Sequence, residues 1–224
     1  METVVISLGG SVLAPAVIDY EFLKKFRALL LKLTKEGKKF IIICGGGKTA
    51  REYMVAASKV VRLADEDLDW LGIHATRLNA HLLRTILRDI AHKRVIRNPN
   101  EKIDFKEKVL IAAGWKPGWS TDHVAVLLAK NHGAKTVINI SNVDNVYDRD
   151  PLNFPGAKPL DKISWKDFRK MVGDKWSPGL NTPFDPVASK KAEKFGLKVV
   201  IMGKELANLE KFLLGKPFKG TIID

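Results

Sequence analysis

The chain's clearest structural signal reads Lys39-Phe40-Ile41-Ile42-Ile43-Cys44-Gly45-Gly46-Gly47-Lys48: an apolar run that passes directly into three glycines and a lysine. The run of apolar, β-branched residues predicts a buried strand, and the glycines predict a turn before a helix that starts near Lys48. The N-terminus has the same order, because Thr3 to Leu8 predicts a strand and Gly9, Gly10 and Ser11 follow it. Two strand-glycine-helix units of this kind favour a sheet of parallel strands.

Strand-like and helix-like segments alternate along the whole chain, which predicts an α/β fold with a mainly parallel sheet. Apolar residues recur at helical spacing from Phe22 to Leu33, and Gly37 offers a stop for that helix. After the helix that starts near Lys48, a second and longer helix is expected, with its apolar face predicted at Leu78, Leu82, Leu83, Ile86, Leu87 and Ile90. Later strands are expected at Val109 to Ala112, Thr136 to Ile140, Lys198 to Met202 and Gly220 to Ile223.

Further helix starts and one long loop complete the pattern. Ser120, Ser164 and Asp185 followed by Pro186 have the side chains that cap a helix N-terminus. Turn-forming residues between Asn142 and Pro159 predict an irregular loop. Since no linker divides the sequence, we expect residues 1–224 to form a single domain.

Composition limits the class of protein. A chain of 224 residues at 46% hydrophobic can bury one sizeable core. The formal net charge is +13, but lysines and arginines are spread along helices without a run of five, which argues for a solvated basic surface and against a nucleic-acid partner. The single cysteine, Cys44, cannot form an intramolecular disulfide, so we expect the cytoplasm. The apolar runs are too short to span a bilayer, and no signal peptide is evident.

The two glycine turns are the strongest candidates for a ligand site. Ligands of an open parallel sheet gather at the carboxyl ends of its strands, where both turns are expected. Glycines let backbone amides approach an anion, and a helix that starts there adds its positive dipole end, so both turns suit phosphate. Lys48 and Arg51 would share one helical face beside them. The alternatives are plain connecting turns and, for Arg51, an ion pair with Glu52; neither turn matches a P-loop or a dinucleotide fingerprint.

A longer set of motifs resembles the archaeal type of UMP kinase, in the amino acid kinase superfamily, over almost the whole chain. In order they are Leu8-Gly9-Gly10-Ser11-Val12-Leu13, Gly45-Gly46-Gly47-Lys48-Thr49-Ala50-Arg51-Glu52-Tyr53, Gly72-Ile73-His74-Ala75-Thr76-Arg77-Leu78-Asn79-Ala80, Pro117-Gly118-Trp119-Ser120-Thr121-Asp122, Asn142-Val143-Asp144-Asn145-Val146-Tyr147-Asp148-Arg149-Asp150-Pro151, Asp185-Pro186, Gly203-Lys204 and Gly220-Thr221-Ile222-Ile223.

This resemblance implies a three-layer α/β/α sandwich, a homohexamer built as a trimer of dimers, and a role in pyrimidine biosynthesis. The reaction it implies transfers the γ-phosphate of ATP, with Mg²⁺, to UMP. The acceptor would bind in the N-terminal part, about residues 1–135, and ATP in the C-terminal part, about residues 136–224.

The resemblance also assigns residues. For UMP they are Gly46, Asp69, Trp115, Lys116, Pro117, Gly118, Trp119, Ser120 and Thr121. For ATP they are Gly9, Gly10, Ser11, Gly47, Arg51, Ser141, Asn142, Tyr147 and Asp150. The catalytic residues would be Asp122, which fixes nearby cationic groups in the superfamily, and Lys48; no residue is assigned to a metal.

Three positions depart from the family pattern. Trp115 and Trp119 replace small or imidazole side chains, and they could stack on a base, fill the uridine pocket, or pack against the core or a neighbouring subunit. Ser7 occupies the place of a catalytic lysine, for which Lys48, Lys116 and Lys175 are candidate substitutes. Asn145 replaces a glycine, and Asn tolerates positive φ.

These departures leave two alternatives to a UMP kinase. One is a kinase for a different small phosphate or carboxylate, for which the tryptophans are the reason. The other is a catalytically weak or inactive nucleotide-binding or nucleic-acid-binding paralogue, for which Ser7 and the net charge are the reasons.

Overall fold

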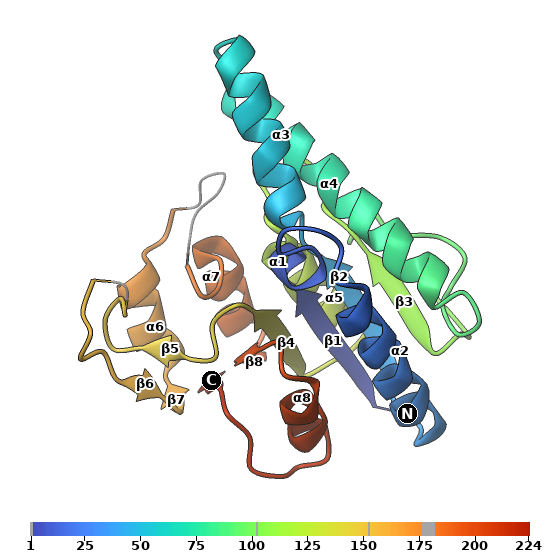
Figure 1. Cartoon of the computed structure of the whole chain (residues 1–224). Helices are drawn as coiled ribbons and strands as arrows, with labels where there is room; N and C mark the ends of the chain where they lie inside the picture. Colours follow the sequence, from blue (N-terminus) through green and yellow to red (C-terminus); the bar gives the residue numbers. More distant parts are fainter. Residues whose placement is uncertain (1, 102, 152, 176–181) are drawn as a thin grey trace.

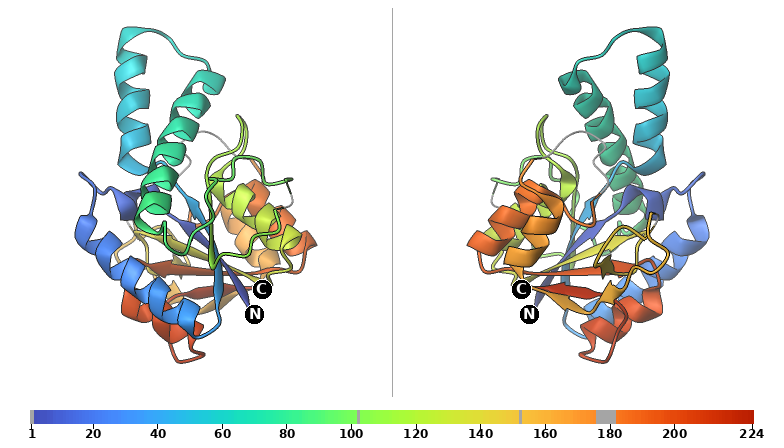
Figure 2. Two further views of the ribbon diagram at one scale, coloured as in Figure 1. Left: turned by 90° about the vertical axis from the view of Figure 1, so that its right-hand side faces the viewer. Right: turned by 90° about the vertical axis from the view of Figure 1, so that its left-hand side faces the viewer.

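The computed structural model describes residues 2–101, 103–151, 153–175 and 182–224. Its centre is a seven-stranded sheet in the order β3-β2-β1-β4-β8-β9-β7, with helices on both faces (Figures 1 and 2). Helices α2 and α8 lie on one side of the sheet, and α5, α6 and α7 lie on the other. The predicted three-layer α/β/α sandwich is therefore confirmed.

The element bounds match the predicted alternation closely. The strands are β1 (Thr3–Leu8), β2 (Lys39–Cys44), β3 (Val109–Ala112), β4 (Thr136–Ser141), β5 (Val146–Tyr147), β6 (Pro159–Leu160), β7 (Lys162–Ile163), β8 (Lys198–Gly203) and β9 (Thr221–Ile223). The helices are α1 (Gly10–Leu13), α2 (Tyr20–Lys35), α3 (Gly47–Val60), α4 (Asp65–Ile86), α5 (Thr121–Asn131), α6 (Trp165–Val172), α7 (Pro186–Lys194) and α8 (Leu206–Leu213).

The inner strands of the sheet are parallel and buried on both faces. β1 lies between β2 and β4, so that Val5 is level with Ile41 on one side and Val137 on the other. Only the pairing of β8 with β9 is antiparallel among the described pairs of this sheet. Side chains that alternate along each strand enter two separate cores, one under α2, α4 and α8 and the other under α5, α6 and α7. Each fully buried Phe, Leu or Ile contributes about 1.5–3 kcal/mol relative to exposure, which explains why these strands read as unbroken apolar runs.

The predicted helix boundaries are confirmed by their caps. The Ser120 hydroxyl accepts a hydrogen bond from the His123 amide at 3.1 Å, and the Ser164 hydroxyl accepts one from the Asp167 amide at 3.1 Å. The Asp185 carboxylate caps α7 in the same way, just before Pro186. None of the described helices has the length and apolar character needed to cross a membrane.

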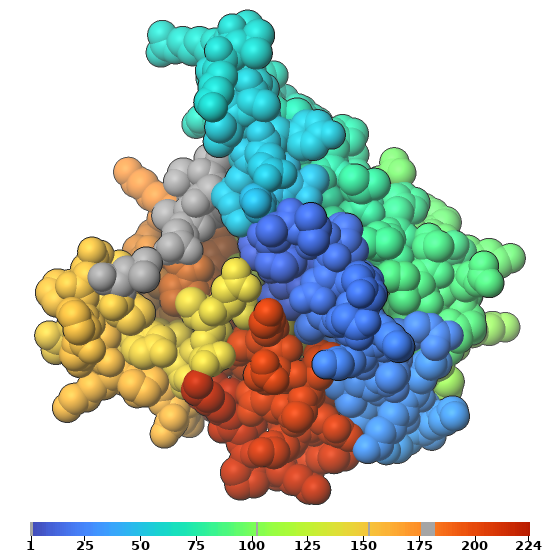
Figure 3. Space-filling view, in the orientation of Figure 1, coloured from blue at the N-terminus to red at the C-terminus, as the bar shows by residue number. Residues whose placement is uncertain are grey.

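Two local expectations about α4 were wrong. Leu78, placed on the apolar face of α4, is 65% exposed, whereas its neighbours Asn79 and Ala80 are buried, so Leu78 lies on the other side of the helix. Helices α3 and α4 form a hairpin that rises above the rest of the surface (Figure 3). The helix also ends at Ile86, so that Ile90 lies beyond it. In addition, the loop from Asn142 to Pro159 is less irregular than expected, since it contains a short antiparallel pair, β5 and β6.

The two glycine turns touch each other directly. Because β1 and β2 are parallel neighbours, their carboxyl ends bring Gly10 and Gly47 into contact. A Cβ atom at Gly10 would lie 2.1 Å from the Gly47 nitrogen, and one at Gly47, where φ is +63°, would lie 2.2 Å from the Gly10 carbonyl carbon. Both distances are far below van der Waals contact, so neither position has room for a side chain.

The fold therefore predicts that Gly10→Ala is strongly destabilising. The added methyl has to separate two main chains, which we expect to lower the free energy of unfolding by about 3 kcal/mol. Chemical denaturation measures this value. Gly156→Ala is the matched control, since a Cβ there meets nothing within 4 Å and should change stability by less than about 0.5 kcal/mol. Equal stability of the two variants would contradict the contact.

Candidate active site

Arg51 connects the two glycine turns. Its Nη2 donates a hydrogen bond to the Ser11 hydroxyl at 3.0 Å, from the first turns of α3 to the start of α1. The ion pair with Glu52 considered above is made instead by Lys48, at 3.5 Å. Gly9, Gly10, Ser11, Gly46, Gly47, Lys48 and Arg51 thus lie in one neighbourhood, where helix N-termini and two cations suit an anion.

Asn79, on α4, supports the second glycine turn, and the sequence did not predict this role. Its side-chain amide donates to the carbonyl of Gly45 at 2.8 Å and to that of Gly46 at 3.3 Å, and the residue is 2% exposed. These bonds satisfy two carbonyls of a turn that has no ladder partner there. An amide side chain on the buried face of α4 is the one feature of the sequence that could have indicated this role.

Asp122 lies in the first turn of α5, and its carboxylate accepts hydrogen bonds from three separate segments of the chain. Its Oδ1 accepts from the Ser7 hydroxyl of β1 at 2.8 Å and from the Asn139 amide of β4 at 3.0 Å. Its Oδ2 accepts from the main-chain N–H of Asp185 at 3.2 Å. All three donors that the described residues supply to Asp122 are neutral.

The surroundings of Asp122 oppose its charge in part. The pKa of the Asp122 carboxyl is raised to about 6 in total: burial raises it most, the hydrogen bond from Ser7 lowers it, and the negative charge of Asp185 raises it. Burial also raises the pKa of Asp185, and the amide of Ala188 opposes that shift. The described residues hold no cluster of three or more His, Cys, Asp or Glu side chains that could bind a metal ion.

The loop before α5 is held against α4 by hydrogen bonds. We call Gly114–Thr121 the acceptor loop, because the residues predicted for UMP are concentrated there. Three hydrogen bonds join it to the helix: the Gly114 amide to Thr76 Oγ1 at 2.8 Å, Arg77 Nη2 to the Trp115 carbonyl at 3.1 Å, and the Gly118 amide to Asp69 Oδ2 at 2.6 Å. The structure thus brings the predicted residue Asp69 to the predicted loop. Thr76 and Arg77 belong to one of the motifs that resemble the family, but no role was predicted for them.

Both tryptophans of the acceptor loop pack against the protein itself. The Trp119 ring lies 4.1 Å from the ring of His123, which is 1% exposed, and Lys191 Nζ lies 5.3 Å from the Trp119 ring. Burial lowers the pKa of His123 to about 4, so this imidazole is neutral at pH 7. Trp115 packs against the core, with Lys116 Nζ 4.5 Å from its ring. Of the interpretations given above, packing within the chain is the one that these contacts support.

The residues predicted for the adenosine part of ATP follow β4. Ser141 ends that strand, Asn142 and Asp150 are exposed, and Tyr147 lies in β5. The first of these therefore lies at the same sheet edge as the glycine turns, since β1 and β4 are parallel neighbours. Asn145 is buried, and among the described residues only glycines have positive φ. Asparagine thus replaces the family's glycine without backbone strain.

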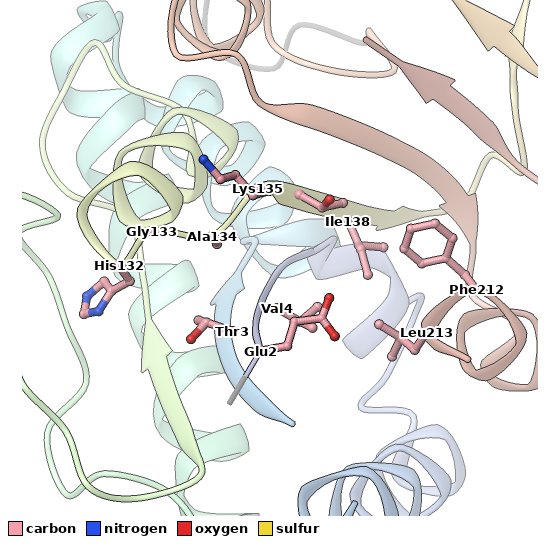
Figure 4. A pocket seen from close by; sticks show the side chains of 11 residues that line it. Glu2, Thr3, Val4, His132, Gly133, Ala134, Lys135, Ile138, Phe212 and Leu213 are labelled. Carbon is pink, nitrogen blue, oxygen red and sulfur yellow. The ribbon is translucent and has the colours of Figure 1, made fainter. Parts of the chain in front are cut away.

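A hollow of about 300 Å³ lies at the other end of the strands (Figure 4). Side chains from the start of β1, from the segment after α5 and from the end of α8 line it, among them Glu2, Lys135 and Phe212. None of the residues predicted for substrates lines this hollow, so the candidate active site remains at the carboxyl ends of the strands.

Comparison with known proteins agrees with this geometry. The model of the amino acid kinase family matches residues 2–203. The chain belongs to the amino acid kinase family. Within this family, a uridylate kinase of Pyrococcus abyssi is 40% identical over 226 residues, covering 99% of each chain.

Solved structures of the amino acid kinase family have the same fold. The crystal structure of uridylate kinase from Archaeoglobus fulgidus has a TM-score of 0.85 and 32% identity, covering all of both chains. A UMP kinase structure from Bacillus anthracis has a TM-score of 0.77 at 20% identity, which supports the fold alone, and covers 100% of this chain and 96% of that one.

The bond between Asp69 and Gly118 gives a structural prediction. In Asp69→Ala the acceptor loop loses its charged acceptor, so we expect the Gly118 amide to exchange its hydrogen at least about tenfold faster. Hydrogen-exchange NMR measures the rate. Asp67→Ala is the control on the same helix, because that carboxylate accepts from the Ala64 amide at 3.3 Å, away from the acceptor loop. Unchanged exchange at Gly118 in Asp69→Ala would show that the bond does not hold the loop.

Proposed function

We propose that the protein is a UMP kinase, which transfers the γ-phosphate of ATP to UMP and yields UDP. The observation that carries the proposal is the direct contact of the two glycine turns at the carboxyl ends of β1 and β2, because glycine turns of this kind suit phosphate. The relatives named above support UMP as the acceptor.

The arrangement suits phosphoryl transfer, where a protein mainly aligns two anions and neutralises charge on the moving group. In the proposed complex the donor phosphates lie on Gly9, Gly10, Ser11, Gly47 and Arg51, and UMP lies on Gly46, Asp69 and the acceptor loop. Ser141, Asn142, Tyr147 and Asp150 complete the ATP site. Most acceptor contacts then fall within about residues 1–135, and the adenosine contacts within about residues 136–224. A phosphate oxygen of UMP is already ionised, so no strong general base is needed.

Charge compensation rests on few protein groups. Ser7 cannot neutralise phosphate, and Lys116 lies over Trp115 while Lys175 is exposed. Lys48 and Arg51 are the cations beside the glycine turns. Mg²⁺, bound with ATP, would neutralise further phosphate charge. The tryptophans do not favour the alternative acceptors, since both rings contact their own chain.

We also propose that the protein is a cytoplasmic homo-oligomer, the hexamer implied by its motifs. The support is a group of exposed apolar side chains at the α3–α4 hairpin, namely Tyr53, Val55, Val60 and Val61. Exposed apolar side chains gathered on one element favour an interface there over single residues scattered across the surface.

The acceptor is tested by a coupled assay with purified protein, ATP and Mg²⁺. We expect kcat/KM for UMP to exceed that for CMP, AMP and GMP by about tenfold or more, because a fixed loop recognises one base better than the others. Arg51→Met should lose most of this activity, whereas Arg62→Met, at an exposed position of the hairpin, should keep it. Turnover of another acceptor without turnover of UMP would reject the proposal.

The pKa of Asp122 predicts an acidic limit to activity. The three donors around this carboxylate require its ionised form, and its pKa is raised to about 6, so kcat/KM should fall as the pH drops through about 6. The second phosphate ionisation of UMP lies near the same pH, at about 6. Asp122→Asn should therefore be slower, and its profile should keep only the fall that belongs to UMP. Profiles of identical shape would argue that Asp122 does not titrate in this range.

A further inference from the structure

Asp185 is a buried acid for which the proposed chemistry has no direct use. The residue is 5% exposed, and one carboxylate oxygen accepts from the Ala188 amide and caps α7. The other oxygen, Oδ2, is buried without a hydrogen bond of normal geometry to any described residue, although the Ser120 hydroxyl is near enough to lower the pKa of this carboxyl. A buried carboxylate with an unsatisfied oxygen is costly, so an amide side chain, which would also cap the helix, would serve the fold better.

The position of Asp185 connects it to Asp122. Its main-chain N–H donates to Asp122 Oδ2 at 3.2 Å, which is the single bond that this oxygen receives from the described residues. The Ser189 hydroxyl donates to the Asp185 carbonyl at 2.7 Å and holds the same turn. The direction of the N–H toward Asp122 therefore depends on how α7 begins, and the side chain of Asp185 fixes that beginning.

The same helix reaches the acceptor loop. Lys191, which lies on α7, has its Nζ 5.3 Å from the Trp119 ring, and α7 packs along α5, whose first turn contains Asp122. A shift of α7 would thus move a donor of Asp122 and a contact of the acceptor loop together.

We propose that Asp185 is a positioning residue of the transfer reaction, which acts through Asp122 by capping α7 and holding the first N–H of that helix segment on the Asp122 carboxylate. The inference rests on the kinase function proposed above. The charge of Asp185 has an effect of its own, because a second carboxylate beside Asp122 raises the pKa of the Asp122 carboxyl.

Most of the groups that face Asp122 carry no charge. Ser7 of β1 and Asn139 of β4 are neutral donors, and His123, the next residue of α5, is neutral at pH 7. The positive charge of Lys191, on α7, lowers the pKa of His123. Among the described residues, Asp185 is the one charged group that shifts the pKa of Asp122.

The test compares Asp185→Asn and Asp185→Ala with Asp19→Asn and Asp19→Ala. Asp19 is the matched control, because its side chain caps α2 by accepting from the Phe22 amide at 2.9 Å, on the face of the sheet opposite α5 and α7. The measurements are kcat and KM for UMP, the pH profile of kcat/KM, the melting temperature, and the pH titration of the Asp122 carboxyl followed by ¹³C NMR without substrate.

We expect Asp185→Ala to lower kcat by about tenfold or more, since the N–H on Asp122 is no longer held in place. Asp185→Asn keeps a good cap but removes the charge, so the Asp122 titration and the acidic limb should both move down by about half a pH unit or more. The Asp19 variants should lower the melting temperature while leaving kcat and both titrations unchanged.

The outcomes separate the two proposals. If the wild-type protein turns over UMP but the Asp185 variants match the Asp19 variants in kcat and in both titrations, Asp185 is only a helix cap and the inference is overturned. If the wild-type protein does not turn over UMP, the proposed function fails, and an NMR titration of Asp122 that Asp185→Asn leaves unmoved overturns the inference separately.

Discussion

The candidate site depends on one main-chain contact. Gly10 and Gly47 lie against each other without side chains, and this lets the ends of β1 and β2 meet instead of diverging. The approach places the first turns of α1 and α3 together and lets Arg51 reach Ser11. Side chains from α4 and α5 then complete a surface that the two turns define. No local property of either turn alone would create it.

Asp122 shows a second way in which this site is organised. In place of a salt bridge, three neutral donors from β1, β4 and the segment before α7 hold the carboxylate. Neutral donors orient an anion without cancelling its charge, and burial then keeps its pKa high. The negative charge thus remains available to cations that arrive with a substrate. Ser7 is one of these donors, at the position for which the family resemblance implies a lysine.

The sequence predicted what is encoded locally. Strands from Thr3 to Leu8 and from Lys39 to Cys44, and the caps at Ser120, Ser164 and Asp185, follow from short-range patterns and were found as expected. Contacts between distant elements could not be read in this way. Asn79 and Asn139 looked like ordinary polar residues within a helix and a strand, because their partners are set by the order of β2, β1 and β4 in the sheet. Leu78 was misplaced because the buried face of α4 carries polar residues at this level, where Thr76 and Asn79 accept from and donate to main-chain groups of neighbouring segments.

Helix α4 contacts the acceptor loop through Asp69 and the second glycine turn through Asn79. Asp69 and Asn79 lie ten positions apart on the helix, a rise of about 15 Å, and each added or deleted residue would rotate one contact relative to the other by about 100°. The segment between these residues is therefore a spacer of fixed length between the two substrate regions. Insertions and deletions in homologous chains should be confined to the tip of the hairpin, between Val60 and Asp65, where length can vary without changing that spacing.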